Sequence, residues 1–310
     1  MNALVRHVAG LHVAAPGKLV ITGAYAVLEG APALVLAVDR YAVACRETFN
    51  LASSYEASFA LKQGEAPGVD VSSFWKEGCK LGLGSSAAGL VASLGLREAE
   101  GGIDLNRSDV RRRLFDVAKE AHARAQGGGS GVDVAASVYG GIICYVSHPP
   151  EPTTIFPVSL PAGTQISCFW SGKSVRTSDA LSRLRIFQKE YAEKYRESMN
   201  PLLLASCEVM KATVAADAPR FVYSVQQFAE ALDAFGQRTG IPIMPEAYRA
   251  LGERAAFEGA AFYPSGAGGG DMCLYVGLQM PSLSLLQHIE RAGLSTFDFE
   301  IDQKGVILIK

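Results

Sequence analysis

Short apolar runs alternate with amphipathic stretches along this chain, which predicts a mixture of strands and helices. Near the N-terminus, runs bounded by Gly and by Asp-Arg predict strands at 19–21, 33–38 and 41–44. Farther on, apolar positions recur at helical spacing, and serines stand where they can cap a first turn. This second pattern predicts two successive helices, at 85–98 and 108–124.

A cluster of prolines between 149 and 161 predicts a domain junction. Residues 50–78 are patterned too weakly to predict an element. Helices and strands are mixed in both halves, so the predicted fold class is α+β (mixed α/β), with two domains at 1–160 and 161–310. Around and after the junction we expect a helical turn and a buried strand within 132–146, a strand at 165–170, a helix from about 178, helices at 224–238, 246–258 and 282–292, and strands at 271–278 and 296–309.

The charge balance and the cysteines narrow the class of protein. The chain has 29 Lys and Arg against 31 Asp and Glu, with no basic stripe, so nucleic acid is not an expected partner. No apolar run approaches the roughly 18 residues of a membrane-spanning helix, and no secretory signal precedes the first strand. We therefore expect a cytoplasmic protein. The six cysteines lie far apart and do not have the spacing of zinc ligands, so we expect their thiols to be buried.

Glycines concentrate in three islands, of which the middle one is the most specific. Residues 80–88 read KLGLGSSAA, so small residues and two hydroxyls lead directly into a predicted helix. A helix N-terminus presents unpaired N–H groups and partial positive charge, which suits a phosphate chain. The segment is neither a P-loop nor a dinucleotide-binding fingerprint. Taken alone, it is equally compatible with a tight strand–helix turn capped by serine.

The other islands are APGKLVITGAYAVL at 15–28 and YPSGAGGGD at 263–271. In this order and spacing the three islands resemble the GHMP small-molecule kinases, over about residues 14–277. Residues 121–141, with AQG, GSG and DVA, resemble the phosphomevalonate kinase branch of that family. Two positions are informative departures: Ala24 stands where many relatives have Glu, and His122 stands where mevalonate kinases tend to have an acidic metal ligand.

The resemblance implies a two-lobed fold, with an N-terminal ATP-binding lobe that contains a left-handed βαβ crossover and a ferredoxin-like C-terminal lobe. It implies a transferase that uses ATP and Mg²⁺ to convert phosphomevalonate to diphosphomevalonate in the mevalonate pathway of isoprenoid biosynthesis. Its partner would be a phosphorylated small molecule, with no nucleic acid or membrane, and a homodimer is compatible with it. Three alternatives stay open: phosphorylation of an alcohol, as in mevalonate kinases, a catalytically silent nucleotide-binding sensor, and the decarboxylase of the same pathway.

Phosphoryl transfer depends on charge neutralisation and alignment, and the resemblance assigns residues to both. Lys18 and Asp133 are the implied catalytic residues, and Ser86 is the implied metal ligand. Asp133 could be a general base or an orienting group, and the sequence leaves both roles open. The side chain of His122 could pack, form a hydrogen bond or supply positive charge, and these roles stay open as well. The implied ATP-binding residues are Gly82, Leu83, Gly84, Ser85, Ser86, Ala87, Ala88, Gly268 and Gly269. The implied acceptor-binding residues are Lys18, Ser130, Gly131, Lys173, Arg176, Thr177, Ser178, Ser265, Gly266 and Ala267.

Overall fold

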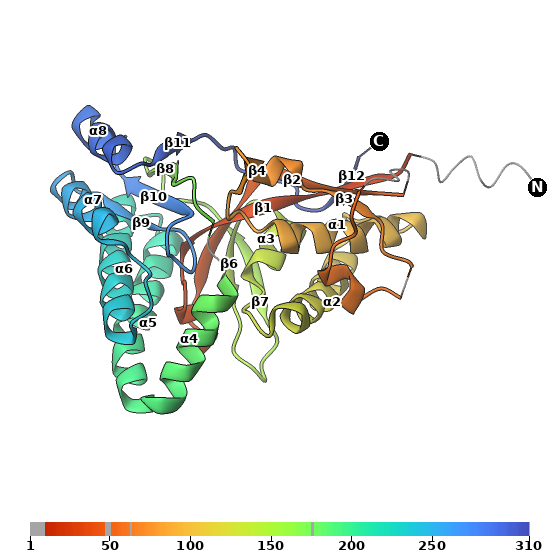
Figure 1. Cartoon of the computed structure of the whole chain (residues 1–310), viewed down its shortest axis with the longest axis horizontal. Coiled ribbons are helices and arrows are strands. Elements are labelled where there is room, and N and C mark those ends of the chain that lie inside the picture. The colour runs from red at the N-terminus through yellow and green to blue at the C-terminus, as the bar shows by residue number, and fades with distance from the viewer. Residues whose placement is uncertain (1–9, 47–50, 63, 175–176, 310) are drawn as a thin grey trace, which may run out of the picture.

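The computed structural model describes residues 10–46, 51–62, 64–174 and 177–309, apart from the side chain of Thr177. In these ranges two larger antiparallel sheets are each packed against helices (Figure 1). The first sheet has six strands in the order β12-β1-β2-β6-β7, with β3 paired to β2. Its strands are β1 (His12–Thr22), β2 (Ala33–Cys45), β3 (Gly68–Asp70), β6 (Ile142–Val146), β7 (Thr154–Val158) and β12 (Ile307–Ile309).

Three helices pack with the first sheet. Helices α1 (Ser85–Glu100) and α3 (Val132–Tyr139) lie against β1 and β2, and α2 (Ser108–Gln126) packs on both helices. Every residue of α1 from 87 to 96 is buried, as expected for a helix enclosed on all sides. The shorter elements of this lobe are η1 (Ala26–Glu29), η2 (Glu56–Phe59), η3 (Ser72–Phe74), and the hairpin β4 (Trp75–Lys76) with β5 (Cys79–Lys80).

The second sheet has four strands in the order β11-β8-β10-β9. Helix α6 begins where Asp217 caps it by accepting a hydrogen bond from the N–H of Arg220. Helices α6 and α7 pack against β9, and α5 packs along α6. The elements are β8 (Gln165–Trp170), β9 (Ala261–Pro264), β10 (Met272–Gly277), β11 (Ser295–Phe297), α4 (Thr177–Glu190), α5 (Ala192–Val214), α6 (Ala218–Thr239), α7 (Glu246–Phe257) and α8 (Leu283–Arg291).

The two lobes meet at the C-terminal end of β1. There Tyr263 Oη donates a hydrogen bond to the carbonyl of Ile21 at 2.8 Å. Two residues after Tyr263, Ser265 Oγ accepts from the N–H of Val20 and donates to its carbonyl, both at 3.0 Å. The turn between β9 and β10 is therefore bound to β1, and one continuous core of buried side chains runs through both lobes.

Several predicted elements need correction. The strands expected at 33–38 and 41–44 are a single strand, β2, whose pairing with β1 shifts at a bulge between Pro16 and Gly17. The strand expected at 296–309 is two strands, β11 and β12, in different sheets. Helix α6 begins at Ala218 rather than 224, and the long helix α5 was not predicted as a separate element.

The structure also bears on the cysteines and on membrane association. Four of the six cysteines are buried, at 45, 144, 168 and 273, as predicted, whereas Cys79 and Cys207 are half-buried. Burial raises the pKa of the Cys144 thiol to about 11. Across the described residues, no helix has the length and hydropathy needed to span a membrane.

Candidate active site

The middle glycine island forms a loop that leads directly into α1. Gly82 and Gly84 have φ angles of 76° and 82°, in the left-handed region that favours glycine. Helix α1 begins at Ser85, and its first turn has no side-chain cap. The first N–H groups of a helix have no intrahelical partner, and the helix dipole places partial positive charge there. The loop therefore has the polarity and the backbone shape to receive phosphate oxygens.

Lys18 joins the first island to this loop. Its Nζ donates to the carbonyl of Gly82 at 3.0 Å, and its backbone N–H donates to the carbonyl of Leu83 at 2.8 Å. The close approach depends on Gly17, because a Cβ at that position would lie 2.7 Å from the Leu83 carbonyl oxygen. The ammonium group is thus held beside the loop.

Asp271, at the end of the third island, packs against the same loop. A Cβ added to Gly82 would lie 2.2 Å from Asp271 Oδ2. Burial raises the pKa of the Asp271 carboxyl, and the nearby charge of Lys18 opposes that rise. All three glycine islands therefore converge around Lys18, although they are far apart in the sequence.

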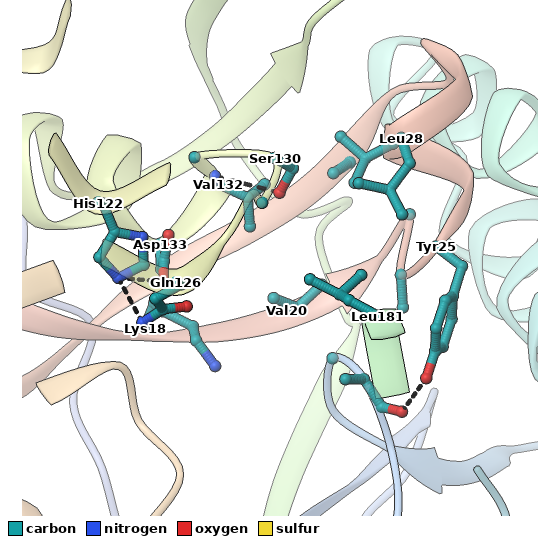
Figure 2. Close-up of a pocket in the computed structure, with 18 residues that line it drawn as sticks. Lys18, Val20, Tyr25, Leu28, His122, Gln126, Ser130, Val132, Asp133 and Leu181 are labelled. Carbon is teal, nitrogen blue, oxygen red and sulfur yellow. Dashed lines mark hydrogen bonds and ion pairs between the residues drawn. The ribbon is translucent and has the colours of Figure 1, made fainter. Parts of the chain in front are cut away.

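A network of polar side chains lies next to Lys18 (Figure 2). His122 Nε2 is 3.1 Å from Ser86 Oγ and 3.6 Å from Asp133 Oδ2. Gln126 Nε2 is 3.1 Å from Ser86 Oγ and 2.9 Å from His122 Nε2. His122 is only 3% exposed, so it packs and makes hydrogen bonds at the same time. The network binds the start of α1 to α2 and α3.

A pocket opens beside this network. Its polar end includes Lys18, His122, Gln126 and Asp133, and its opposite end is largely apolar (Figure 2). The apolar end combines side chains of the first island with one residue of α4, from the other lobe. The other lining residues are Val20, Gly23, Ala24, Tyr25, Val27, Leu28, Ala33, Gly129, Ser130, Gly131, Val132, Leu181, Gly266 and Ala267.

Only some of the acceptor residues that the sequence predicts line the pocket. Those in the pocket wall are Lys18, Ser130, Gly131, Gly266 and Ala267, and Asp133, the other implied catalytic residue, lines the pocket with them. Ser265 is 6% exposed, and its hydroxyl is engaged by Val20. Lys173 lies exposed after β8, and Ser178 lies in the first turn of α4; neither lines the pocket. Arg176 and the side chain of Thr177 lie outside the described residues.

The predicted nucleotide residues of the third island pack against a loop of their own lobe. The N–H of Gly269 donates to the carbonyl of Ile243 at 2.8 Å. A Cβ on Gly268 would lie 2.5 Å from Cγ2 of Ile243, so glycine permits this close approach. Two aromatic residues that precede the middle island, Phe74 and Trp75, are sequence candidates to contact the nucleotide base. Phe74 is 1% exposed, whereas Trp75 is 45% exposed. Of these two rings, only Trp75 has an accessible face.

Several residues of the pocket wall were not selected as site residues from the sequence, among them Tyr25, Leu28, Gln126 and Leu181. Tyr25 Oη donates to the carbonyl of Ala267 at 2.5 Å, and burial raises its pKa. The AQG segment contained the signal for Gln126. Leu181 reaches the pocket from the second lobe, and no local pattern indicates that contact.

A protein oxygen of the kind that Mg²⁺ binds lies at the start of α1. Within the described ranges no group of three or more His, Cys, Asp or Glu side chains could hold a metal ion. Ser86 Oγ is a hard oxygen donor at the start of α1, the kind of ligand that Mg²⁺ accepts together with phosphate oxygens and water. A single serine beside a phosphate-binding loop is consistent with that shared mode of binding.

This chain is similar to known proteins both in sequence and in fold. Residues 42–141 match the family described as GHMP kinases N terminal domain. The chain is 26% identical to a phosphomevalonate kinase of Streptomyces sp. over 63% of its own length and 57% of that relative. It is also 26% identical to a mevalonate kinase of Archaeoglobus fulgidus, over 63% of this chain and 71% of the relative. Streptococcus pneumoniae phosphomevalonate kinase, solved with phosphomevalonate and AMPPNP, superimposes with a TM-score of 0.76 at 17% identity, covering 94% of this chain and 100% of the other.

Proposed function

We propose that this chain, which has the N-terminal domain and the two-lobed fold of the GHMP kinases, transfers the γ-phosphoryl group of ATP to phosphomevalonate. The products would be ADP and diphosphomevalonate, an intermediate of isoprenoid biosynthesis. The observation that carries the proposal is the position of Lys18. Its ammonium lies between a phosphate-binding loop and a pocket that also contains Asp133.

The reaction needs little proton transfer when the acceptor is a phosphomonoester. Its second pKa is about 6, so its oxygen is ionised at neutral pH. That oxygen would attack the γ-phosphorus while the bond from the γ-phosphorus to the β–γ bridging oxygen breaks, and the electron pair would stay on ADP. Lys18 would neutralise charge on the transferred group, and the N–H groups of α1 would hold the remaining phosphates. When bound, Mg²⁺ would add positive charge between the phosphates, with Ser86 as its protein ligand.

The polar network supports an anionic acceptor. Asp133 lies 3.6 Å from His122, which can hold this carboxylate in a fixed orientation beside Lys18. A histidine at this position also adds no negative charge to a pocket that must bring two polyanions together. Asp133 would then orient and balance charge, and no base would be required.

Phosphorylation of an alcohol is the second candidate function. Asp133 lines the pocket, and a carboxylate there could accept the proton of an attacking hydroxyl. The matching relatives also include two mevalonate kinases, from Archaeoglobus fulgidus and Pyrococcus horikoshii. A silent nucleotide sensor has less support, because it would not need Lys18 and Asp133 together in one pocket.

The two chemistries are separated by an acceptor panel combined with Asp133→Asn. Turnover of phosphomevalonate and of mevalonate is measured from pH 5 to 9 with excess MgATP. For a phosphomonoester acceptor, the acid limb of the rate profile should lie near pH 6 in both proteins, because it follows the ionisation of the substrate. Preference for mevalonate, with loss of the acid limb in Asp133→Asn, would overturn the proposal in favour of the alcohol kinase.

A further inference from the structure

The basic side chains in the pocket wall already have carboxylates nearby. The charge of Lys18 acts on the carboxyl of Asp271, and His122 Nε2 lies 3.6 Å from Asp133 Oδ2. A doubly charged phosphate entering this pocket would therefore meet little uncompensated positive charge from these residues. A further cation is needed to bind such an acceptor tightly.

Arg185 of α4 is placed to supply that charge. Leu181 lines the pocket, and Arg185 follows it by four residues, so both side chains lie on the same face of the helix. Figure 1 shows α4 between the two lobes, in green. The Arg185 guanidinium reaches the first lobe, because a Cβ added to Gly128 would lie 2.1 Å from its Nη2.

The surroundings of the guanidinium leave its charge available. Gly128 directly precedes the wall segment 129–131, so the guanidinium lies at the edge of the pocket. Arg185 is exposed, and none of the ion pairs between described residues includes it. Arginine binds phosphate through two parallel N–H donors, which gives both affinity and orientation.

We propose that Arg185 binds the phosphate group carried by the acceptor and selects phosphorylated acceptors over alcohols. This inference rests on the proposed function, since it concerns the same pocket. The side chain comes from the second lobe and contacts a glycine loop of the first. Binding of the acceptor phosphate would therefore hold α4 against residues 128–131.

The test compares Arg185→Gln with Arg183→Gln, a matched control. Arg183 is an exposed arginine of the same helix, whereas the three heavy atoms nearest to a Cβ at Gly128 all belong to Arg185. Steady-state constants are measured for phosphomevalonate and for ATP, and binding of phosphomevalonate in the presence of MgADP is measured by calorimetry. We expect Arg185→Gln to lower kcat/KM for phosphomevalonate by about 10- to 100-fold, mainly through KM, as for loss of a charge-assisted hydrogen bond. The KM for ATP and the melting temperature should not change, and Arg185→Lys should recover part of the loss.

The outcomes separate this inference from the proposed function. If the wild type turns over phosphomevalonate and Arg185→Gln has an unchanged KM, the role of Arg185 is wrong and the function stands. If the wild type does not turn over phosphomevalonate but binds it in an Arg185-dependent manner, the phosphate site stands and the proposed function fails. If binding is equally weak in the wild type and in Arg185→Gln, the inference is overturned. An equal effect of Arg183→Gln would also overturn it, because the loss would then reflect general electrostatics of the helix.

Discussion

The packing of Asp271 against Gly82 leads to a testable prediction about the loop before α1. In Gly82→Ala the new Cβ would lie 2.2 Å from Oδ2, 2.5 Å from Cγ and 3.0 Å from Cβ of Asp271. Rotation of the Asp271 side chain leaves the Cβ of Asp271 in place. It therefore cannot relieve the contact between that atom and the new Cβ at position 82. The substitution must therefore move the loop or the turn that carries Asp271.

The energy of this substitution has two parts, and Gly102 isolates the first. Gly82 and Gly102 have φ angles of 76° and 74°, but nothing lies within 4 Å of a Cβ at Gly102. Alanine in the left-handed region costs about 1–2 kcal/mol, which both variants should lose. Overpacking adds about 1–3 kcal/mol in Gly82→Ala alone. We therefore expect a loss of about 1–2 kcal/mol for Gly102→Ala and about 2–5 kcal/mol for Gly82→Ala.

Urea unfolding of the two variants measures this difference, and turnover shows its consequence for the site. Lys18 Nζ is bonded to the Gly82 carbonyl, so movement of the loop should lower kcat by at least about 10-fold in Gly82→Ala and leave it unchanged in Gly102→Ala. Adding Asp271→Ala removes the two closest contacts, with Oδ2 and Cγ, and should recover part of the overpacking energy, because the contact with Cβ at 3.0 Å remains. Equal stabilities of the two glycine variants, or no recovery in the double variant, would refute the assignment of this contact.

Two further predictions concern charges at the same site. Lys18→Met should lower kcat by about 100- to 1000-fold, as for loss of a transition-state electrostatic contact, with a much smaller change in the KM for ATP; a pure KM effect in steady-state kinetics would make Lys18 a binding residue only. For Asp271→Asn, the measurement is the stability difference from the wild type as a function of pH. Burial raises the folded-state pKa of Asp271, so the wild type should lose stability as pH rises from about 3.8 through that raised pKa, relative to the variant, and the difference should then stay constant to neutral pH. A difference that is independent of pH from 3 to 7 would contradict the burial of this carboxyl.

The elements predicted well from sequence are those with a strong local signal. Helix α1 was expected at 85–98 and spans Ser85–Glu100, because glycines set its start and its apolar residues keep a regular spacing. Strand β8 was expected at 165–170 and has those bounds, since a short apolar run is punctuated on both sides. Helix α7 was similarly well predicted.

The elements that were predicted poorly either have a weak local pattern or depend on contacts between distant segments. Helix α5 contains Pro201, and its many charged residues weaken the apolar pattern that would mark it as a separate helix. β11 and β12 are not separated by the sequence pattern, because the alternation of apolar and polar residues continues past β11 through Phe299 and Ile301. What separates them is pairing with β8 and β1, in different sheets, which local sequence does not encode.

The same division applies to the site. The glycine islands were visible because close backbone approach and left-handed angles need glycine wherever they occur, as at Gly17 and Gly84. Leu181, which α4 supplies to the pocket wall, was not predicted from the sequence. Leu181 and Arg185 lie on an ordinary amphipathic helix, and only the packing of two lobes brings that helix to the pocket.

The return of the C-terminal segment to the first sheet has a consequence for how the protein folds. β12 pairs with β1 through His12 and Ile309, and the N–H of Gly141 donates to the carbonyl of Asp302. During synthesis, β1 is made long before β12, so this edge of β1 stays unpaired until the residues between the two strands have followed. An exposed strand edge invites association with other chains, so the nascent first lobe should depend on rapid completion or on chaperones. Once β12 has paired with β1, unfolding of one lobe should be coupled to unfolding of the other. The pocket is then formed and lost in the same transition.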